Sequence, residues 1–414
     1  MSASKRAPEQ SMTSLAELRS DTAVIVFGPD HWGDYPQTRH HVAAALAARG
    51  WSVTYTTGPH FIWDALGAKW RHARWRTRSS TTEGVILNWP GRWQTRWPRI
   101  AAWDVNVQSR FIATLERQSG WRSAARRIAY LFRPEFVPEL ARLGDCRVVY
   151  HADDSFSKMP NWSPAQRALE EQLVARADLI VATSEGVRRN LPGKGAAEAR
   201  ILANGADVQL FGDGPAQPCP ADIAAIPRPR IGYVGSLNPK VDFRLVQAIA
   251  AQRPDWHWVL VGRVNAQAIA ADPVSREAWR ALGRMSNVHV LGSKPYCELP
   301  RYEGHMDVNT LCYRTDPGGW WTDVSPLKLY EYLAVGRPVV GCALEALAPL
   351  RHVVTIANDT GEWISAIEGA LQGRAARAVE AGRQIARQHS WSHVVDPLDG
   401  WLLDLATPAA SRTA

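Results

Sequence analysis

The sequence predicts an α/β protein with two doubly wound, Rossmann-like domains that face a central cleft. Short apolar strands alternate with helical segments, many strands end at a glycine or a polar loop, and this alternation restarts near residue 230. At 414 residues the chain is long enough for two such domains. We expect a ligand in the cleft, where the carboxyl ends of both sheets meet.

The first domain is predicted over residues 21–210, after a disordered lead at 1–20. It opens with a strand at 22–27, an alanine-rich helix at 38–49 and a strand at 51–56, the order of a doubly wound domain. Further strands are expected at 84–88, 147–151 and 178–183, and further helices at 132–143, 163–177 and after Ser184. Residues 200–203 are expected to end the domain.

Residues 211–229 are rich in Pro, Gly, Asp and Ala without periodicity, which predicts an interdomain linker. The second domain is predicted over 230–390, a helix at 391–405 is expected to cross back onto the first domain, and 406–414 form a tail. Its strands are expected at 230–234, 256–261, 288–291, 308–312 and 339–340, and its helices at 242–251, 299–304, 325–335, 361–372 and 375–388.

Composition narrows the class of protein. No run of 18 apolar residues is present, and the polar N-terminus lacks the apolar stretch of a signal peptide. The five cysteines are scattered and form no CxxC pair, so we expect neither a disulfide framework nor a structural zinc site. These features predict a cytoplasmic protein.

The net charge of +8 is partly clustered in a segment at 62–127, whose thirteen lysines and arginines run from Lys69 to Arg127 and are interleaved with eight tryptophans. Arginine with tryptophan suits a surface that contacts anionic lipid headgroups. The same composition is also compatible with core tryptophans beside solvated arginines, or with stacking on single-stranded nucleic acid. The sequence leaves the first two alternatives open, and we do not expect nucleic acid to be the partner.

The most informative segment runs from Asp323 to Val340, through a loop, an amphipathic helix, a glycine stop and a short strand. Ser325 and Lys328 near a helix N-terminus suit the oxygens of a diphosphate. Glu331 can accept hydrogen bonds from the vicinal hydroxyls of a ribose. Asp323 would lie near a donor sugar. These residue types predict a nucleotide-sugar site, although a surface helix with a Lys–Glu pair has the same pattern.

SPLKLYEYLAVGRPVV at 325–340 resembles the donor-binding signature of GT-B glycosyltransferases. Other pieces follow in the family's order, and together the resemblance covers roughly 22–405. They are IGYVGSL at 231–237, NV…LG…PY…LP at 287–300, ADLIVATS at 177–184, NGAD at 204–207 and SW at 390–391. The spacing of Asp323 and Glu331 is similar to the E-x7-E motif of retaining members, with Asp in place of the first Glu.

A second candidate constellation is His151-Ala152-Asp153-Asp154, where a strand of the first domain ends. One carboxylate of a pair can raise the pKa of the other, which suits a general base near neutral pH. The order resembles bacterial exopolysaccharide glucuronosyltransferases, whose Tyr-x-Ala-x-Asp stretch maps the base onto Asp154. His151 is a competing base, and both aspartates could instead shape the loop.

Two glycine-containing loops complete the candidate site. In the loop after the first strand, Asp30, His31 and Arg39 are expected on the acceptor side, although a structural turn is an equal alternative. In the second domain, Gly235 would let the backbone approach the diphosphate. The remaining candidates are Ser236, Arg263 and Lys240 for phosphate, and Trp320, Trp321 and Arg314 for the donor sugar.

The resemblance implies a glycosyltransferase that moves a sugar from a UDP- or GDP-sugar to a glycan or polyprenyl-linked acceptor, in bacterial surface or exopolysaccharide synthesis. No metal cluster is evident, so we expect no cofactor, and basic groups would stabilise the leaving diphosphate. Membrane contact would be peripheral, at the inner face of the cytoplasmic membrane. A non-hydrolysing nucleotide-sugar epimerase and a non-catalytic GT-B-like partner protein remain alternatives.

Overall fold

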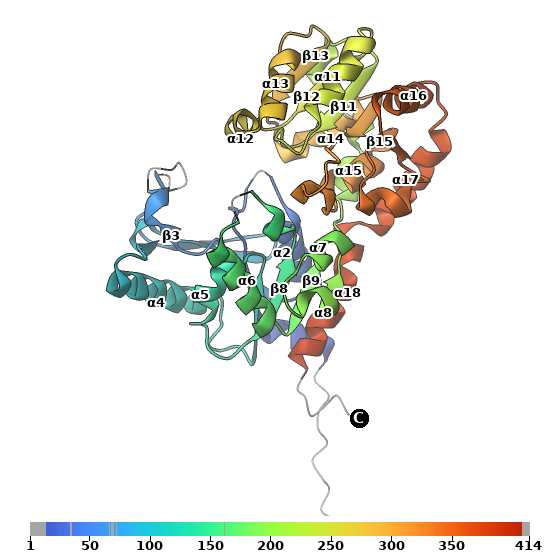
Figure 1. The fold of residues 1–414 in the computed structure, drawn as a ribbon. Coiled ribbons are helices and arrows are strands. Elements are labelled where there is room, and N and C mark those ends of the chain that lie inside the picture. Colours follow the sequence, from blue (N-terminus) through green and yellow to red (C-terminus); the bar gives the residue numbers. More distant parts are fainter. Residues whose placement is uncertain are drawn as a thin grey trace, which may run out of the picture.

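A computed structural model describes residues 14–33, 35–65, 67, 70–71, 73–160 and 162–407. Two parallel sheets form the centres of two lobes, one above the other in Figure 1. The predicted α/β class is confirmed. Lys69, most of the predicted lead and most of the predicted tail lie outside the described residues.

The first sheet has eight strands in the order β10-β9-β8-β7-β1-β2-β5-β4, and all pairs are parallel except β4 with β5. Its strand order reverses between β1 and β7, where Ile25 faces Ala129 across the pair. The strands are β1 (Thr22–Phe27), β2 (Ser52–Thr56), β4 (Arg78–Thr82), β5 (Val85–Trp89), β7 (Arg126–Leu131), β8 (Arg147–Ala152), β9 (Leu179–Ala182) and β10 (Arg200–Ile201). The short strands β3 (His60–Phe61) and β6 (Thr95–Arg96) form a separate pair.

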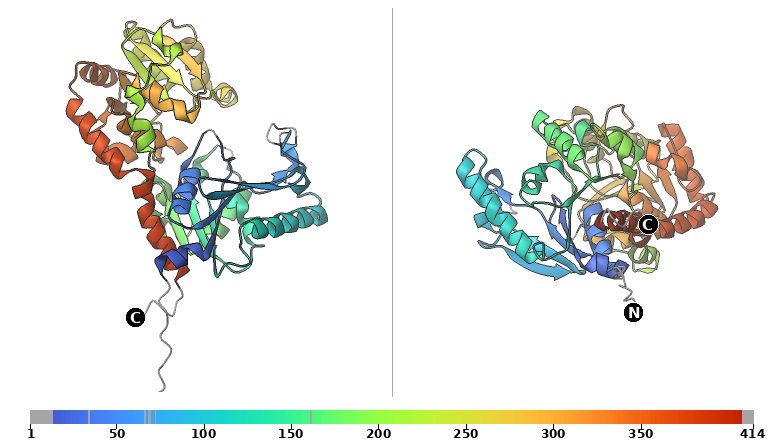
Figure 2. Two further views of the ribbon diagram at one scale, coloured as in Figure 1. Left: turned by 180° about the vertical axis from the view of Figure 1, so that it is seen from behind. Right: turned by 90° about the horizontal axis from the view of Figure 1, so that it is seen from below.

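Helices cover both faces of the first sheet (Figure 2). One face packs against α4 (Ala101–Gln118) and α6 (Pro164–Arg176), which bury residues such as Phe111 and Leu173. The other face packs against α2 (Thr38–Ala48) and the last helix, α18 (Trp391–Ala406). Shorter helices are α1 (Leu15–Ser20), α5 (Val137–Leu140), α7 (Glu185–Arg189) and α8 (Gly195–Glu198).

The second sheet has six parallel strands in the order β13-β12-β11-β14-β15-β16. In chain order within the domain this is 3-2-1-4-5-6, the dinucleotide-binding arrangement, whose ligand site lies where β11 and β14 diverge. The strands are β11 (Arg230–Val234), β12 (His257–Val261), β13 (Val288–Gly292), β14 (Val308–Leu311), β15 (Val339–Gly341) and β16 (Thr355–Ile356). The helices are α11 (Phe243–Gln252), α12 (Ala266–Ala271), α13 (Pro273–Leu282), α14 (Leu299–Gly304), α15 (Leu327–Val335), α16 (Thr360–Leu371) and α17 (Ala376–Gln388).

The connection between the two sheets differs from the irregular linker expected at 211–229. It contains the end of α9 (Val208–Gly212), a turn at Gly214–Ala216 and α10 (Ala221–Ala224). Phe211 and Ile223 are fully buried in the core of the second domain. Isolated apolar residues therefore anchor this segment. Because these residues have no periodicity, the sequence pattern did not predict its short helices.

Several other elements were absent from the sequence-based prediction. The strand β7 was missed because arginines occupy its first two positions, and α4 because arginine and tryptophan obscure its apolar stripe. The helix expected at 132–143 is reduced to a turn at Pro134–Phe136 and the four-residue α5. The predicted disordered lead is wrong for 15–20, because Ser14 and Glu17 form a capping box that starts α1.

The last helix joins the two ends of the chain. Asp399 of α18 accepts hydrogen bonds from Arg19 of α1, at 2.6 and 3.1 Å, and from the indole of Trp51, at 2.7 Å. Asp396, one turn earlier, pairs with Arg49 at the surface. Of the helices that the structure describes, none combines the length and the apolar character that a membrane span requires.

We predict that Asp399→Ala lowers the free energy of unfolding by about 2 kcal/mol, because it leaves Trp51 and Arg19 without their acceptor. Asp396→Ala is the matched control on the same helix, and its exposed pair should contribute less than about 1 kcal/mol. Urea unfolding of both variants checks the difference. Equal effects of the two substitutions would contradict the assigned role of Asp399.

Candidate active site

The carboxyl ends of β11 and β14 converge on the side chain of Lys328, in the first turn of α15. Its ammonium nitrogen is buried, lies 3.9 Å from the centroid of the Tyr233 ring and 5.5 Å from that of Tyr313, and has no hydrogen-bond partner among the described residues. Burial, and then the charge of Lys240, lower the pKa of Lys328 well below its usual value. A buried, unpartnered cation at a strand-order switch point is suited to an anionic ligand.

Lys240 is a second cation at the same place, in the loop between β11 and α11. Its ammonium lies 5.1 Å from the centroid of the Tyr313 ring and 5.8 Å from that of Trp320. Burial lowers the pKa of Lys240, and the nearby charge of Asp154 opposes this effect. Because Asp154 belongs to the first domain, Lys240 faces it across the cleft.

Gly235 makes room for this arrangement. It has a φ of +137°, and a Cβ atom placed there would lie 2.2 Å from the Lys328 ammonium. Any other residue at this position would therefore displace the lysine or block the approach of a ligand to the backbone. Ser236 follows it at the half-buried edge of the cleft, whereas the side chain of Arg263 is exposed at the end of the neighbouring strand.

Glu331 lies one turn beyond Lys328 on α15 and is also buried. The hydroxyl of Tyr296 donates to its Oε1 at 3.1 Å. Burial is the main cause that raises the pKa of Glu331 to about 7, while the Tyr296 hydrogen bond and Lys328 lower it. Tyr296 also borders a cavity of about 450 Å³ that residues of both domains line. Glu331 is thus held near the domain boundary.

The sequence predicted Asp323 beside a donor sugar, whereas the structure places its side chain against residues of the first domain. Its carboxylate is bound by Lys158, at 2.6 Å, and by the Asn190 side chain, at 2.9 Å. Its carbonyl accepts the Ser184 hydroxyl. All three partners belong to the first domain, so Asp323 connects the domains. The loop that carries it passes close to α7, which sequence spacing could not reveal.

Ser325 also contacts the first domain. Its carbonyl accepts a hydrogen bond from the Asn204 side chain at 2.7 Å, and Asn204 in turn accepts from Thr38 of α2. The side chain of Ser325 is half-buried one residue before the N-cap Pro326. The N-terminus of α15 is therefore positioned by the domain opposite the one to which it belongs.

In the first domain, Asp153 and Asp154 follow β8 directly, as predicted. Arg39 of α2 donates to Asp153 at 2.7 Å and also pairs with Asp30. The Arg39 guanidinium is 11% exposed and occupied by two carboxylates, so it positions Asp153 and is not open to an acceptor. Asp30 is fixed by the same pair.

Asp154 has the electrostatic character of a general base. Burial, and then the charge of Asp153, raise its pKa to about 7, whereas Lys240, Arg133 and Arg39 lower it. A carboxylate with a pKa near neutrality can exchange a proton with a substrate hydroxyl at working pH. Its position opposite Lys240 places it next to the cationic site of the second domain.

His151, the competing base, is fully buried inside the first domain, beside β7. Its Nδ1 pairs with the Tyr130 hydroxyl at 2.8 Å, and its ring stacks on Phe132 with centroids 4.7 Å apart. Burial lowers the pKa of His151 to about 3, so the ring stays neutral inside the domain. The alternation of side chains along the strand turns His151 away from the cleft, and a role as base is not supported.

Trp320 and Trp321 lie on the short turn Trp320–Thr322 beside the cationic site. The Arg314 guanidinium stacks on Trp321, 5.2 Å from the ring centroid, and also pairs with Asp272 at 3.1 Å. Both tryptophans are half-buried, with Lys240 over Trp320. These aromatic rings border the cleft where a sugar would meet the lysines.

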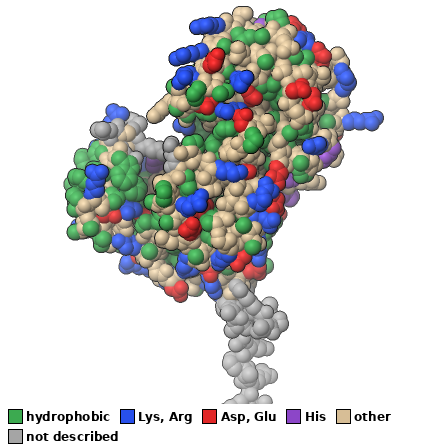
Figure 3. All heavy atoms as spheres, in the orientation of Figure 1, with side chains coloured by type: hydrophobic (Ala, Val, Ile, Leu, Met, Phe, Trp, Pro, Cys, Tyr) green, Lys and Arg blue, Asp and Glu red, His purple; other side chains and the backbone are tan. Residues whose placement is uncertain are grey.

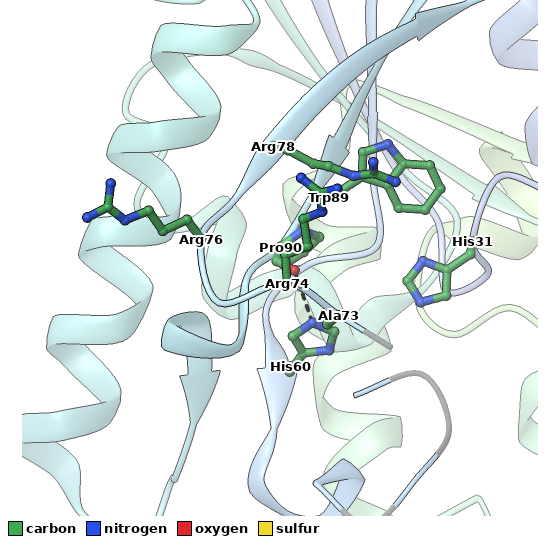
Figure 4. Close-up of a pocket in the computed structure, with 8 residues that line it drawn as sticks. All are labelled: His31, His60, Ala73, Arg74, Arg76, Arg78, Trp89 and Pro90. Atoms are coloured by element: carbon green, nitrogen blue, oxygen red, sulfur yellow. Dashed lines mark hydrogen bonds between the residues drawn. The ribbon is translucent and has the colours of Figure 1, made fainter. Parts of the chain in front are cut away.

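His31 borders two cavities of the first domain. Its ring stacks on Trp89, with centroids 5.7 Å apart and planes 16° apart. The smaller cavity, of about 260 Å³, lies beside Arg74 and Arg78 (Figure 4). The larger, of about 510 Å³, extends to Arg133. Of the three acceptor-side candidates, His31 is the one that lines these cavities.

The tryptophan-rich segment divides into core and surface. Trp121 is buried, and Trp70 and Trp89 are half-buried with hydrogen-bonded indoles. Of the thirteen large hydrophobic side chains exposed in the described residues, eight belong to this segment, which we call the tryptophan surface. They are Ile62, Trp63, Trp75, Trp93, Trp97, Ile100, Trp103 and Val105. Figure 3 shows hydrophobic side chains gathered on the lobe at the left, where α4 lies.

Sequence reasoning missed four residues that shape this site. Tyr296 orients Glu331, Lys158 and Asn190 hold Asp323, and Arg133 faces the aspartate pair. Tyr296 could have been found within the PY pair of the family-like stretch. The other three carry no local signal, because their partners are distant in the chain.

Comparison with known proteins finds sequence relatives of this chain. Residues 228–373 match the family described as "Glycosyl transferases group 1". A relative is TuaH of Bacillus subtilis (strain 168), whose name assigns it provisionally to teichuronic acid biosynthesis as a glycosyltransferase. It is 28% identical over 235 residues, which is 55% of this chain and 57% of that protein. The chain therefore spans little more than half the length of this curated relative.

Solved structures resemble the whole chain. Sucrose-phosphate synthase of Thermosynechococcus elongatus aligns with a TM-score of 0.68 at 17% identity, covering 93% of this chain and 98% of that one. An E. coli structure described as trehalose-6-phosphate bound with UDP-2-fluoro glucose aligns with a TM-score of 0.67 at 14% identity, covering 93% of this chain and 99% of that one. Anabaena HepE in complex with UDP and glucose aligns with a TM-score of 0.65 at 14% identity, covering 92% of this chain and 99% of that one.

The family match and the structural neighbours confirm the GT-B fold that the sequence predicted. The chain has the GT-B fold, and its residues 228–373 match the group 1 glycosyltransferase family.

Proposed function

We propose that this protein transfers a sugar from a nucleoside diphosphate sugar to a glycan or lipid-linked acceptor. The observation that carries the proposal is the unpartnered, buried ammonium of Lys328, which faces the same cleft as Asp154. The E. coli and Anabaena neighbours contain UDP or a UDP-sugar analogue, which supports UDP as the carrier. The name of the Bacillus relative supports a place in surface polysaccharide synthesis.

In this proposal Lys328 and Lys240 bind the diphosphate, with the backbone N–H of Ser236, which the missing side chain of Gly235 leaves accessible, and the hydroxyl of Ser325. Glu331 accepts the ribose hydroxyls, and Arg263 lies at the outer edge of the site. The two lysines supply the positive charge that the leaving diphosphate requires, and we propose that no metal ion or cofactor is needed.

The chemical step begins when Asp154 accepts the proton of the acceptor hydroxyl. The acceptor oxygen forms a bond to the anomeric carbon of the donor sugar, and the bond between that carbon and the diphosphate oxygen breaks. The electron pair of that bond leaves with the nucleoside diphosphate, whose new charge is stabilised by Lys328 and Lys240. Trp320 and Trp321 border the sugar during this step.

We further propose that the protein is cytoplasmic and docks on the inner face of the cytoplasmic membrane through the tryptophan surface. Exposed indole rings suit the interface of a bilayer, and neighbouring exposed arginines such as Arg71 and Arg99 suit its anionic headgroups. The larger cavity of the first domain borders the same segment, since Phe61 and Trp63 line it. A lipid-linked acceptor would therefore enter beside the membrane.

We predict that Lys328→Ala weakens UDP binding by about 1.5–3 kcal/mol, roughly 10- to 150-fold, because a charged phosphate partner is lost. The lowered pKa of Lys328 means that binding of an anion should draw a proton onto its amine. Calorimetry in EDTA, in two buffers of different ionisation enthalpy, measures both effects. Arg263→Ala is the control, with a smaller effect and unchanged proton uptake; equal behaviour of the two variants would remove Lys328 from the phosphate site.

We predict that Asp154→Asn lowers turnover by about 10²- to 10⁴-fold while UDP affinity stays within about twofold. Because the pKa of Asp154 is raised to about 7, the deprotonated base is lost as pH falls through 7, so wild-type turnover should fall there too. Rates of nucleotide release with acceptor, measured from pH 5.5 to 8.5, check this limb. Turnover of the donor without any acceptor would instead indicate an epimerase.

We predict that the protein sediments with vesicles containing anionic lipid and that binding weakens as salt increases. Replacing Trp63 and Trp97 by serine should reduce the bound fraction severalfold, because two exposed rings are removed from the tryptophan surface. Replacing the exposed Val274 and Val290 by serine on the other lobe is the control. Salt-insensitive binding, or no binding to any vesicle, would refute membrane docking.

A further inference from the structure

The smaller cavity of the first domain is strongly basic. Arg74, Arg76 and Arg78 border it together with His31, His60 and Trp89, and none of the described residues that line it carries a carboxylate. Figure 4 shows the side chains of Arg74 and Arg78 converging beside Trp89, whereas the guanidinium of Arg76 points away. We call this space the basic cavity. Its volume of about 260 Å³ is large enough for a phosphate or diphosphate group.

The arginines of the basic cavity are held by the backbone. The N–H of Arg92 donates to the Arg74 carbonyl at 2.8 Å, and that of Trp93 donates to the Trp75 carbonyl at 3.2 Å. A Cβ atom at Gly91 would lie 2.5 Å from the carbonyl carbon of Arg76, so only glycine allows the two segments to approach this closely. The Arg78 guanidinium stacks over Trp89 at 5.5 Å. The backbone that carries the arginines is thus fixed in place, and the Arg78 guanidinium is held against Trp89, as a binding site requires.

The basic cavity also leads toward the proposed base. His31 lines both this cavity and the larger one, which extends to Arg133. Arg133 lies close enough to Asp153 and Asp154 to lower the pKa of both. A molecule anchored by an anionic group in the basic cavity could therefore extend past His31 and present a hydroxyl to Asp154.

The outer side of the same segment belongs to the tryptophan surface. Trp75 lies between Arg74 and Arg76 in the chain, is 56% exposed, and packs against Trp93 with ring centroids 5.6 Å apart. Arg92 stacks on Trp75 at 5.0 Å. The anion-binding and apolar features therefore belong to a single short segment.

We propose that the basic cavity binds the diphosphate of an isoprenoid-linked acceptor whose hydrocarbon chain lies at the tryptophan surface. This inference rests on the proposed function and names the acceptor class for it. Arg74 and Arg78 bind the phosphate oxygens as charged donors, and Trp89 closes the inner wall. The apolar chain stays at the membrane interface while the sugar that follows the diphosphate reaches toward Asp154.

The test measures binding of farnesyl diphosphate, with farnesol and inorganic pyrophosphate as comparison probes, in the presence of saturating UDP so that the donor site is filled. The variant is Arg74→Ala/Arg78→Ala. The matched control is Arg110→Ala/Arg117→Ala, which removes the same charge from exposed positions of the same segment outside the cavity. Melting temperatures of both double variants should equal that of the wild type.

We expect the variant to bind farnesyl diphosphate roughly tenfold more weakly than wild type, and the control to stay within about twofold. Farnesol should bind weakly to all three proteins, and pyrophosphate more weakly than farnesyl diphosphate to the wild type. Equal loss in variant and control would overturn the cavity assignment, and equal affinity for pyrophosphate and farnesyl diphosphate would overturn the lipid source. If UDP affinity is unchanged in both variants, a negative result concerns the acceptor cavity alone. If the proposed function itself is wrong, UDP would not bind.

Discussion

The burial of one unpaired ammonium group organises the cleft. An amine enclosed by the rings of Tyr233 and Tyr313 without a hydrogen-bond partner among the described residues destabilises the unliganded protein by several kcal/mol if it stays charged. Lowering the pKa of Lys328 reduces that cost. The arrangement requires Gly235 beside the ammonium, and it favours ligands that bring negative charge. The strand order of the second domain supplies the place, because β11 and β14 diverge there.

The helix that carries Lys328 is positioned by both domains. Its hydrophobic face belongs to the core of the second domain, but the loop before it is held by the first domain, through Asp323 and the carbonyl of Ser325. A substitution at Asn190 or Asn204 would therefore alter the position of α15 and of its Lys328. Such coupling is typical of proteins whose ligand lies between two domains, where the closed arrangement and the binding geometry depend on the same contacts.

The arginine and tryptophan residues of the first domain serve two purposes. Arg96 is buried and pairs with Asp104 at 2.9 Å and Glu139 at 2.8 Å, so it stabilises the buried side of the tryptophan-rich segment. Breaking such a buried pair is costly because a charge would be left alone. On this rigid support, tryptophans with more than 40% exposure, such as Trp63 and Trp93, remain at the surface. An apolar surface of this extent on a folded domain indicates an interaction site.

Local pattern alone determined the alternation of strands and helices, the two-domain division of the sheets, and the signature around Lys328 and Glu331. These features can be predicted from sequence because apolar periodicity and glycine stops depend only on residues close together in the chain. Elements whose pattern is masked by arginine, such as β7 and α4, were missed for the same reason. Tertiary structure alone decided that Asp323 faces Lys158, that His151 turns into the core while Asp154 faces Lys240, and that Arg74, Arg78 and His31 share one cavity. Each of these facts depends on segments distant in the chain meeting in space, and no spacing within one segment encodes such a contact.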